Sequence, residues 1–198
     1  MTIYTDFPSI NPSATTWELV QNTRFFRSPV TNAVQTVGRK GAFWHVTMTF
    51  SNLQTAERAQ LQAFITKLNG QEHKFVMHDH AYVRRGTGGG SPVTTSGQTG
   101  STVNITAATA DVDPWLMAGD YLSFDNELKM CTEDCETNGS GAVTVKIAPP
   151  IRKATTDGAV DIVAPVVGVF MLVNNPQWTN EIGLVSTFDL ELVEDVIV

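Results

Sequence analysis

The sequence contains only two cysteines, Cys131 and Cys135, too few for the disulfide framework that stabilises many small secreted proteins. Long hydrophobic runs are also missing, because the longest, residues 163–173, contains Pro165 and Gly168 and falls short of the ~20 apolar residues of a membrane span. The first residues, MTIYTDFPSINPS, lack the basic and apolar regions of a signal peptide. We therefore expect a chain that is made and folded in a cytoplasm and has no membrane partner.

Charge is scarce as well. Charged residues make up 17% of the chain, below the ~25% typical of globular domains, and neutral polar residues take their place. A surface of this kind is easily buried against other subunits, since little charge must be desolvated. The net charge of −7 argues against a nucleic-acid partner, which requires a basic face to displace counterions from phosphates.

The few charges are unevenly distributed. Residues 1–86 carry nine Lys or Arg and five Asp or Glu, whereas residues 87–163 carry four and ten. Residues 164–198 carry five acidic residues and no Lys or Arg. The basic first segment could meet the acidic last segment within one subunit or across neighbouring subunits, and charge alone does not distinguish the two.

Catalytic motifs are absent from the sequence: it has no G-x-S-x-G, P-loop or H-E-x-x-H string. The glycine run 86–90 lacks the lysine and helix of a phosphate-binding loop and is interpreted as a linker. The carboxylate pairs Glu133-Asp134 and Glu194-Asp195 are adjacent in sequence, so on a strand their side chains diverge and suit solvation better than acid–base work. We predict no enzymatic activity, no catalytic residues and no cofactor.

Two groups of residues are candidates for metal binding or thiol chemistry. His78 and His80 would lie on the same side of a strand, but a closed zinc site needs two further ligands. Cys131 and Cys135 would approach disulfide distance on opposite arms of a hairpin, although reduced thiols are expected in a cytoplasm. Neither cysteine has an adjacent Lys, Arg or His to lower its pKa, which disfavours a nucleophilic role. We predict no metal site.

Four tryptophans could present an aromatic face to a sugar ring. Trp17 and Trp44 fall on alternating strands and are predicted core residues. Trp115, in the loop segment Asp113-Pro114-Trp115-Leu116, is the candidate carbohydrate contact; the alternative is a loop anchor packed under a barrel.

One amphipathic helix is predicted, over residues 53–68. Its apolar residues recur at three- and four-residue steps, Ser51 and Gln54 fit a capping box, and Asn69-Gly70 ends it. The rest is typical of strands, with β-branched and aromatic residues in alternation. The predicted strands outside the middle of the chain are residues 16–27, 43–50, 73–77, 166–173 and 182–193.

The middle of the chain differs in pattern. Residues 85–100 are rich in Gly, Ser and Thr and predict a flexible loop. Short strands at close spacing then predict a small barrel or sandwich, and Pro149-Pro150 is expected to end the last of them. The predicted strands here are residues 102–107, 121–124, 128–131 and 143–147.

These patterns predict a mainly β fold with one helix. Residues 1–83 and 164–198 are expected to form one domain from both chain ends, into which residues 84–163 are inserted as a small β-barrel. Insertion is structurally inexpensive where the ends of the inserted segment lie close together.

The order of the segments resembles the distal tail proteins of long-tailed bacteriophages of the siphovirus type, particularly those with a small inserted barrel. The likeness covers most of the chain, from about Trp17 to Glu194, and is one of order and spacing. The residues that carry it are the Trp-containing strand 43–50, the helix with Leu68-Asn69-Gly70, the string AGDYLS at 118–123, the string VTVKIAPPIR at 143–152, and FDLELVE at 188–194.

The resemblance implies a belt-type β-sandwich domain that closes into a ring, expected to be a hexamer, with an oligonucleotide/oligosaccharide-binding-type (OB) barrel projecting from it. It implies a structural virion protein that joins the tail tube to the tail tip or baseplate hub, with itself, the tube protein and the hub proteins as partners. The protein would be made in the bacterial host cytoplasm and reside at the tail tip of the virion. The family supplies no catalytic residues.

Other functions remain open at this point. One is another minor tail or tail-tube protein, although tube proteins normally lack a long insertion. A second is a carbohydrate-binding module that uses the inserted barrel and Trp115. A hydrolase ranks lowest, because all four histidines lie before residue 81 and most acidic residues lie after it.

Overall fold

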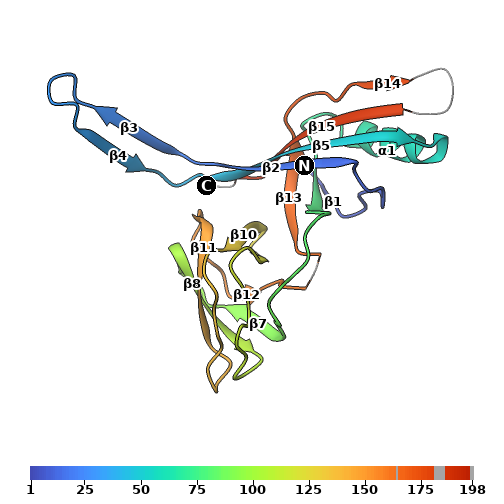
Figure 1. Ribbon diagram of the computed structural model, residues 1–198. Helices are drawn as coiled ribbons and strands as arrows, with labels where there is room; N and C mark the ends of the chain where they lie inside the picture. The colour runs from blue at the N-terminus through green and yellow to red at the C-terminus, as the bar shows by residue number, and fades with distance from the viewer. Residues whose placement is uncertain (164, 181–185, 197–198) are drawn as a thin grey trace.

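The computed structural model describes residues 1–163, 165–180 and 186–196. The fold is mainly β with one helix, as the sequence predicts. Figure 1 shows two β-rich parts, one above the other, and a thin two-stranded ribbon that extends far from the upper part. The first strand of the chain (β1, Ile3–Tyr4) and the last (β15, Ser186–Glu194) both lie in the upper part.

The upper part is a seven-stranded sheet with the order β1-β6-β13-β15-β5-β2, to which β14 adds by pairing with β15. Its strands come from the beginning and the end of the chain. The longest, β5, alternates buried Trp44, Val46, Met48 and Phe50 with more exposed residues, as the sequence pattern predicts. The bounds are β1 (Ile3–Tyr4), β2 (Ala14–Val20), β5 (Phe43–Leu53), β6 (Lys74–His78), β13 (Val167–Leu172), β14 (Trp178–Asn180) and β15 (Ser186–Glu194).

Two predicted strands of this part differ in extent from the observed ones. The predicted strand 16–27 is two strands, β2 and β3 (Thr23–Arg27), of which only β2 belongs to the sheet. The predicted strand 182–193 is confirmed from Ser186 onward as β15, and residues 182–185 lie outside the described residues.

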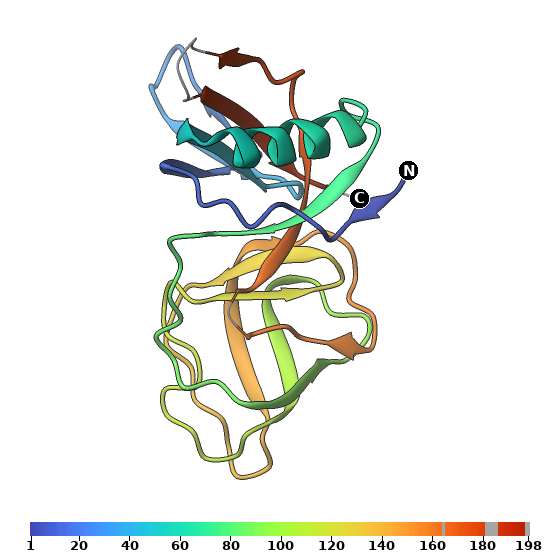
Figure 2. The ribbon, with the colours of Figure 1, turned by 90° about the vertical axis from the view of Figure 1, so that its right-hand side faces the viewer.

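Helix α1 (Thr55–Lys67) covers one face of this sheet, as Figure 2 shows. Leu61, Phe64 and Ile65 are buried against the strands, which confirms the predicted apolar stripe. The predicted capping box at Ser51 is wrong by three residues: β5 continues through Leu53, because Leu53 still pairs with Ser186. The helix begins after Gln54, whose backbone N–H donates to the Glu57 carboxylate at 2.9 Å.

The helix ends where the sequence predicts. Asn69 and Gly70 both have positive φ, 51° and 67°, and this left-handed backbone ends a helix at little cost only for Gly and Asn.

The lower part is a six-stranded sheet with the order β12-β7-β8-β11-β10-β9. An additional bridge between Ser123 and Asp161 joins its two edges, so that the sheet nearly closes into a barrel. Its core includes Val103, Ile105, Leu122 and Val145, all fully buried. The bounds are β7 (Gly90–Thr94), β8 (Gly100–Ala108), β9 (Tyr121–Phe124), β10 (Glu127–Cys131), β11 (Val143–Ile151) and β12 (Gly158–Ala159).

The predicted flexible loop over residues 85–100 is wrong, because β7 lies inside it and pairs with β8. The glycines serve close packing in this segment. A Cβ at Gly86 would lie 2.5 Å from the Trp115 carbonyl oxygen, and the Gly86 N–H donates to buried Asp120 at 2.8 Å. Glycine permits this backbone approach, which a composition-based linker prediction does not anticipate.

The prediction that Pro149-Pro150 ends the last barrel strand is also wrong, since β11 continues to Ile151. The strand changes partner at this point: Lys146 pairs with β8, and Ala148 pairs with β10. The ladder with β8 is irregular between Lys146 and Ile151. Proline lacks a backbone N–H. At such an irregularity this N–H would not take part in a ladder hydrogen bond, so proline is tolerated there.

An aromatic cluster joins the two parts. The ring of Tyr121, from β9 of the barrel, lies 5.9 Å from Trp44 and 6.1 Å from Trp17 of the upper sheet, centroid to centroid. The Trp44 indole N–H donates to the carbonyl of Leu128 on β10 at 3.1 Å. Tyr121 and Leu128 belong to the same buried cluster as the upper sheet's core, so the barrel is packed on the sheet and not merely tethered to it.

Candidate interaction surfaces

The ribbon in Figure 1 is a free hairpin of β3 and β4 (Val34–Gly38), which we call the arm (residues 21–42). It forms a two-stranded sheet of its own and is joined to the β2–β5 ladder through the irregular residues 21–22 and 39–42, where the Arg39 N–H donates to the Asn22 carbonyl at 2.9 Å. Its tip is a tight turn in which the Ser28 carbonyl and hydroxyl accept backbone N–H groups. The pairing of β3 with β4 places Phe25 opposite Thr36 and Phe26 opposite Gln35.

The arm buries almost nothing within the chain. Every residue from 21 to 40 except Ser28 is exposed, including Phe25 at 70% and Phe26 at 58%. Because adjacent strand residues point to opposite faces, each face of the arm shows one phenylalanine. A two-stranded ribbon is marginally stable alone in water, and exposed apolar surface of this kind marks a contact with another molecule.

The arm is also strongly basic. Residues 21–42 contain no Asp or Glu and four cationic residues: Arg24, Arg27, Arg39 and Lys40. Its partner surface should therefore combine apolar or neutral contact area with acidic groups.

Such a surface lies on the same chain, on the face of β2, β5 and β15 opposite the core. Glu18, Asp189 and Glu191 project from this face, which we call the acidic sheet face, and these three strands contain no Lys or Arg. His45 lies between two of the carboxylates, its Nε2 3.0 Å from Glu191 and its Nδ1 3.9 Å from Glu18. Four threonines lie on the same face: Thr16, Thr47, Thr49 and Thr187.

The arm does not cover the acidic sheet face of its own chain, because it points away from the β2–β5 ladder (Figure 1). No other part of the described chain covers the arm either.

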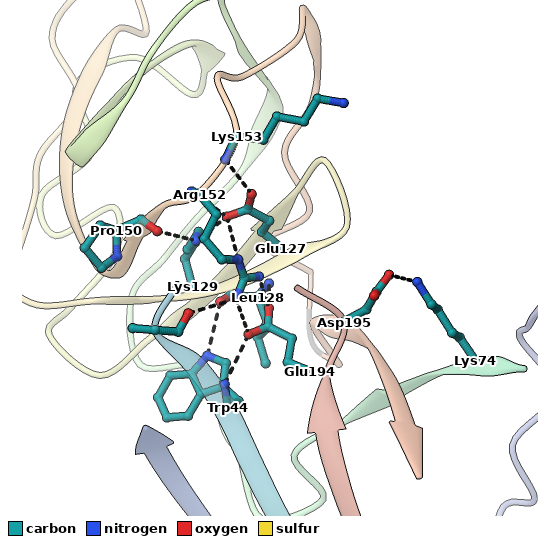
Figure 3. Close-up of polar contacts among 11 residues, drawn as sticks. Trp44, Lys74, Glu127, Leu128, Lys129, Pro150, Arg152, Lys153, Glu194 and Asp195 are labelled. Carbon is teal, nitrogen blue, oxygen red and sulfur yellow. Dashed lines mark hydrogen bonds and ion pairs between the residues drawn. The ribbon is translucent and has the colours of Figure 1, made fainter. Parts of the chain in front are cut away.

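A buried ionic network fixes the barrel beneath the sheet, as Figure 3 shows. Arg152 of the barrel binds the Glu194 carboxylate of β15 with two hydrogen bonds of 2.8 and 2.6 Å. Glu194 also accepts the backbone N–H groups of Leu128 at 2.9 Å and Trp44 at 3.2 Å. Both charged side chains are almost completely buried, at 1% and 0% exposure. Burial acts to lower the pKa of Arg152, but the hydrogen bond to Glu194 and the negative charges of Glu194, Glu127 and Asp195 together outweigh it, and the pKa is raised.

A second buried pair lies beside the first. The Lys129 ammonium contacts Glu127 and donates to the Pro150 carbonyl at 3.0 Å. Burial lowers the pKa of Lys129. Glu127 accepts the backbone N–H groups of Arg152 and Lys153, so it also orders the strand end that carries the arginine.

The prediction that the adjacent carboxylates Glu194-Asp195 are solvated is wrong. Glu194 is held by Arg152 as above, and Asp195 forms an ion pair with Lys74 of β6, with both side chains about one-tenth exposed. The sequence contains no local signal for these partners, because they lie more than 40 residues away. Glu133, in contrast, is exposed and pairs with Lys146 on the barrel surface.

The candidate carbohydrate contact Trp115 is not an exposed platform. Its side chain is fully buried in the barrel core, and its indole N–H donates to the Gly89 carbonyl at 3.2 Å. The alternative prediction of a loop anchor is confirmed, since a buried ring has no face for a sugar. Trp44 is core, as predicted, and the exposed tryptophan is Trp178, which stacks on Phe188.

His78 and His80 lie together at the end of β6, their rings stacked with centroids 4.4 Å apart. Burial lowers the pKa of both, and the neighbouring His78 lowers that of His80 further. Both imidazoles are therefore neutral over a wider pH range than an exposed histidine. Within residues 1–163, 165–180 and 186–196, no group of three or more His, Cys, Asp or Glu side chains could hold a metal ion.

Cys131 and Cys135 are both free thiols. They lie on one side of the barrel, where each makes backbone hydrogen bonds to the segment 115–120. Over the same described ranges, no helix is long and apolar enough to cross a membrane.

Comparison with known proteins gives no assignment: no family model matches the chain, and no curated protein matches it significantly. Function must therefore be argued from the surfaces themselves. The arm escaped the sequence prediction because its second strand, β4, is short and polar. The available signal was the run 21–42, which combines four cations, no acid and two adjacent phenylalanines.

Proposed function

We propose that this chain is a structural virion protein, a distal tail protein of a long-tailed bacteriophage. Copies assemble head-to-tail into a ring, expected to be a hexamer, that joins the tail tube to the tail tip or baseplate hub. The observation that carries the proposal is the arm, a basic, apolar hairpin exposed over nearly its whole length.

The arm supports assembly because its exposed area is costly in a monomer. Phe25, Phe26, Val30, Val34 and Val37 are all at least 45% exposed, and burial of such side chains contributes ~25 cal/mol per Å² of apolar area. A second copy offers the acidic sheet face, whose charge is opposite to that of the arm.

The two surfaces support a ring in particular. An interface between two different patches is heterologous, and repeated rotation of such an interface gives either a closed ring or a filament. Because the arm extends from one side of each copy, each copy can place its own arm on one neighbour and receive the arm of the other neighbour. The unpaired outer edge of β2 would be covered by the same contact, which removes an aggregation hazard.

The position of the barrel is compatible with this arrangement. The barrel packs on the core side of the sheet, through Tyr121 and Leu128, and leaves the acidic sheet face open. The barrel would therefore project from the ring, as expected for an appended module.

The arm provides the first test. The double substitution Phe25→Ser/Phe26→Ser removes exposed apolar area only, so the fold should be retained while the oligomer is lost. Circular dichroism checks the fold and multi-angle light scattering checks the mass. The matched control is Val83→Ser, an equally exposed apolar residue outside the arm, at 78%. Wild-type protein that stays monomeric, both alone and with tail tube protein, would count against the proposal.

A charge exchange tests the docking site. Arg24→Glu/Arg27→Glu should dissociate the oligomer, and so should Glu18→Lys/Asp189→Lys on the acidic sheet face. Combining all four substitutions in one chain should restore assembly, because the complementarity is re-created with reversed sign. Failure of the combined variant to assemble, with the fold intact, would place the arm's partner elsewhere.

The tail assignment has its own test. A tape-measure gene upstream and a tail-hub gene downstream of this gene are expected, and an antibody to the barrel should label the tail tip in electron micrographs. Labelling along the whole tail would instead indicate a tube protein.

A further inference from the structure

The barrel holds two cysteines, Cys131 at the end of β10 and Cys135 four residues later. Both pair with the same neighbouring segment, residues 115–120. The Cys131 N–H donates to the Asp120 carbonyl at 2.7 Å, and the Cys131 carbonyl accepts from Gly119 at 2.8 Å. Four residues later, the Cys135 N–H donates to the Leu116 carbonyl at 2.9 Å, and the Cys135 carbonyl accepts from the Trp115 N–H at 2.8 Å. The segment 115–120 therefore fixes the backbone on both sides of a three-residue loop.

This segment turns back on itself, since the Asp120 N–H donates to the Met117 carbonyl at 2.9 Å, so the two cysteines attach at neighbouring points and their thiols interact. They differ in access: Cys131 is 1% exposed, whereas Cys135 is partly exposed. Neither thiol is needed to satisfy another side chain. Their hydrogen-bond acceptors are backbone carbonyls, of Glu133 at 2.8 Å for Cys131 and of Leu116 at 3.6 Å for Cys135.

The interaction between the two thiols makes them unequal. A Cys135 thiolate is stabilised by the Cys131 thiol, which raises the pKa of Cys131 and lowers the pKa of Cys135. The thiolate is the nucleophile in thiol–disulfide exchange, so the accessible residue is also the more reactive. This differs from the sequence-based expectation, which considered only Lys, Arg and His neighbours and therefore found no activating group.

We propose that Cys131 and Cys135 form a redox-modification site, at which a small-molecule disulfide converts the pair into an intramolecular disulfide that staples the barrel. The inference is independent of the proposed tail function. It follows from the fixed backbone on both sides of the loop, the turn at 117–120 that brings the two attachment points together, and the exposure of one of the two thiols.

The reaction has a defined order. The Cys135 thiolate attacks one sulfur of the small disulfide, forms a mixed disulfide and releases one small thiolate. Cys131 then loses its proton to solvent, and its sulfur attacks the Cys135 sulfur and releases the second small thiolate. The two cysteines are oxidised by two electrons, and the small disulfide is reduced to two thiols.

The disulfide would fix the exposed loop 132–134. In the reduced protein, polar contacts hold this loop. The Ala118 N–H donates to the Asp134 carboxylate at 2.8 Å, the Thr132 N–H donates to the Lys146 carbonyl at 2.9 Å, and the Lys146 ammonium donates to Glu133. A covalent closure limits the conformations of the unfolded chain and so raises stability. Oxidation is expected after the protein leaves a reducing cytoplasm.

The test uses the folded full-length chain and glutathione disulfide. Mass spectrometry of the wild type should show the loss of two hydrogen atoms and of both free thiols, with at most a transient glutathione adduct. Cys131→Ser should accumulate a stable adduct on Cys135, because the resolving thiol is missing. Cys135→Ser should stay unmodified, because Cys131 is buried.

Three results would overturn the proposal: a persistent adduct on wild-type Cys135, unreacted thiols in the folded wild type, or a disulfide-linked dimer. The variants' folds are checked independently by circular dichroism. If serine destabilises either site, alanine at the same position preserves the comparison, since each thiol's acceptor is a backbone carbonyl.

Discussion

Glu194 and Arg152 carry opposite charges into the interior, at the boundary between the sheet and the barrel. Their effect on the stability of the fold depends on the hydrogen bonds that each of the two charged groups makes. The carboxylate accepts two hydrogen bonds from the guanidinium and two from backbone N–H groups, and the guanidinium also donates to the Ala42 carbonyl at 3.1 Å. A buried pair of this kind contributes little net stability as a unit, but loss of one partner leaves an uncompensated charge.

We therefore predict that Glu194→Gln lowers the free energy of unfolding by about 3 kcal/mol, because the buried network of Arg152, Lys129, Glu127 and Glu194 is then left with one uncompensated positive charge. The measurement is urea denaturation followed by circular dichroism. The matched control is Glu133→Gln, which removes one partner of an ion pair whose side chains are 58% and 61% exposed. That change should cost less than about 1 kcal/mol. Equal effects at the two positions would mean that the buried pair is solvated in solution.

Among the elements, β13 and β10 make the closest contact between the sheet and the barrel. Gly168 on β13 lies directly against Leu128 on β10. A Cβ at Gly168 would lie 3.0 Å from the Leu128 Cβ and 2.9 Å from Phe170 Cε2. The strands approach this closely only because position 168 has no side chain.

Gly168→Ala should therefore destabilise the protein by about 1–3 kcal/mol, the usual cost of overpacking a core. Thermal unfolding monitored by circular dichroism measures it. Gly38→Ala, in the arm, is the control: no atom lies within 4 Å of the added Cβ, so its effect should stay within about 0.5 kcal/mol. A neutral Gly168→Ala would show that the barrel can shift away from the sheet without penalty.

At the scale of the whole molecule, the sheet and the barrel are connected by the aromatic cluster around Tyr121, the Arg152–Glu194 pair and the Gly168–Leu128 contact. All three would have to break before either part could unfold alone. The chain also crosses between the parts twice, once after β6 and once before β13.

We expect the protein to unfold in one cooperative transition. Tryptophan fluorescence, which reports on Trp17 and Trp44 at the junction and on Trp115 inside the barrel, should coincide with far-ultraviolet circular dichroism along a denaturant titration. The measurement is made at a concentration where the protein is monomeric, for which Phe25→Ser/Phe26→Ser is suitable. Two resolved transitions would mean that the barrel and the sheet are energetically independent.

Several features could be predicted from the sequence because their cause is local. The alternation in residues 43–50 predicts β5, the three- and four-residue spacing of Leu61, Phe64 and Leu68 predicts the helix, and Asn69-Gly70 predicts its end. Four of the six barrel strands, β8 to β11, followed from short apolar runs between turns, and β9 was predicted with its observed bounds. In each case the pattern of side chains along the chain matches the period of the element.

Only the tertiary structure decided the rest, because the deciding partners lie far away in sequence. Trp115 is buried since the barrel closes around it, Glu194 is unsolvated since Arg152 reaches it, and the glycines at 86–90 are packed since Asp120 and Trp115 lie against them. The arm is the converse: its residues suit a buried strand, yet no other part of the described chain covers them. Local pattern determines the element that a segment forms, but what covers that element is determined by chain topology and by other molecules.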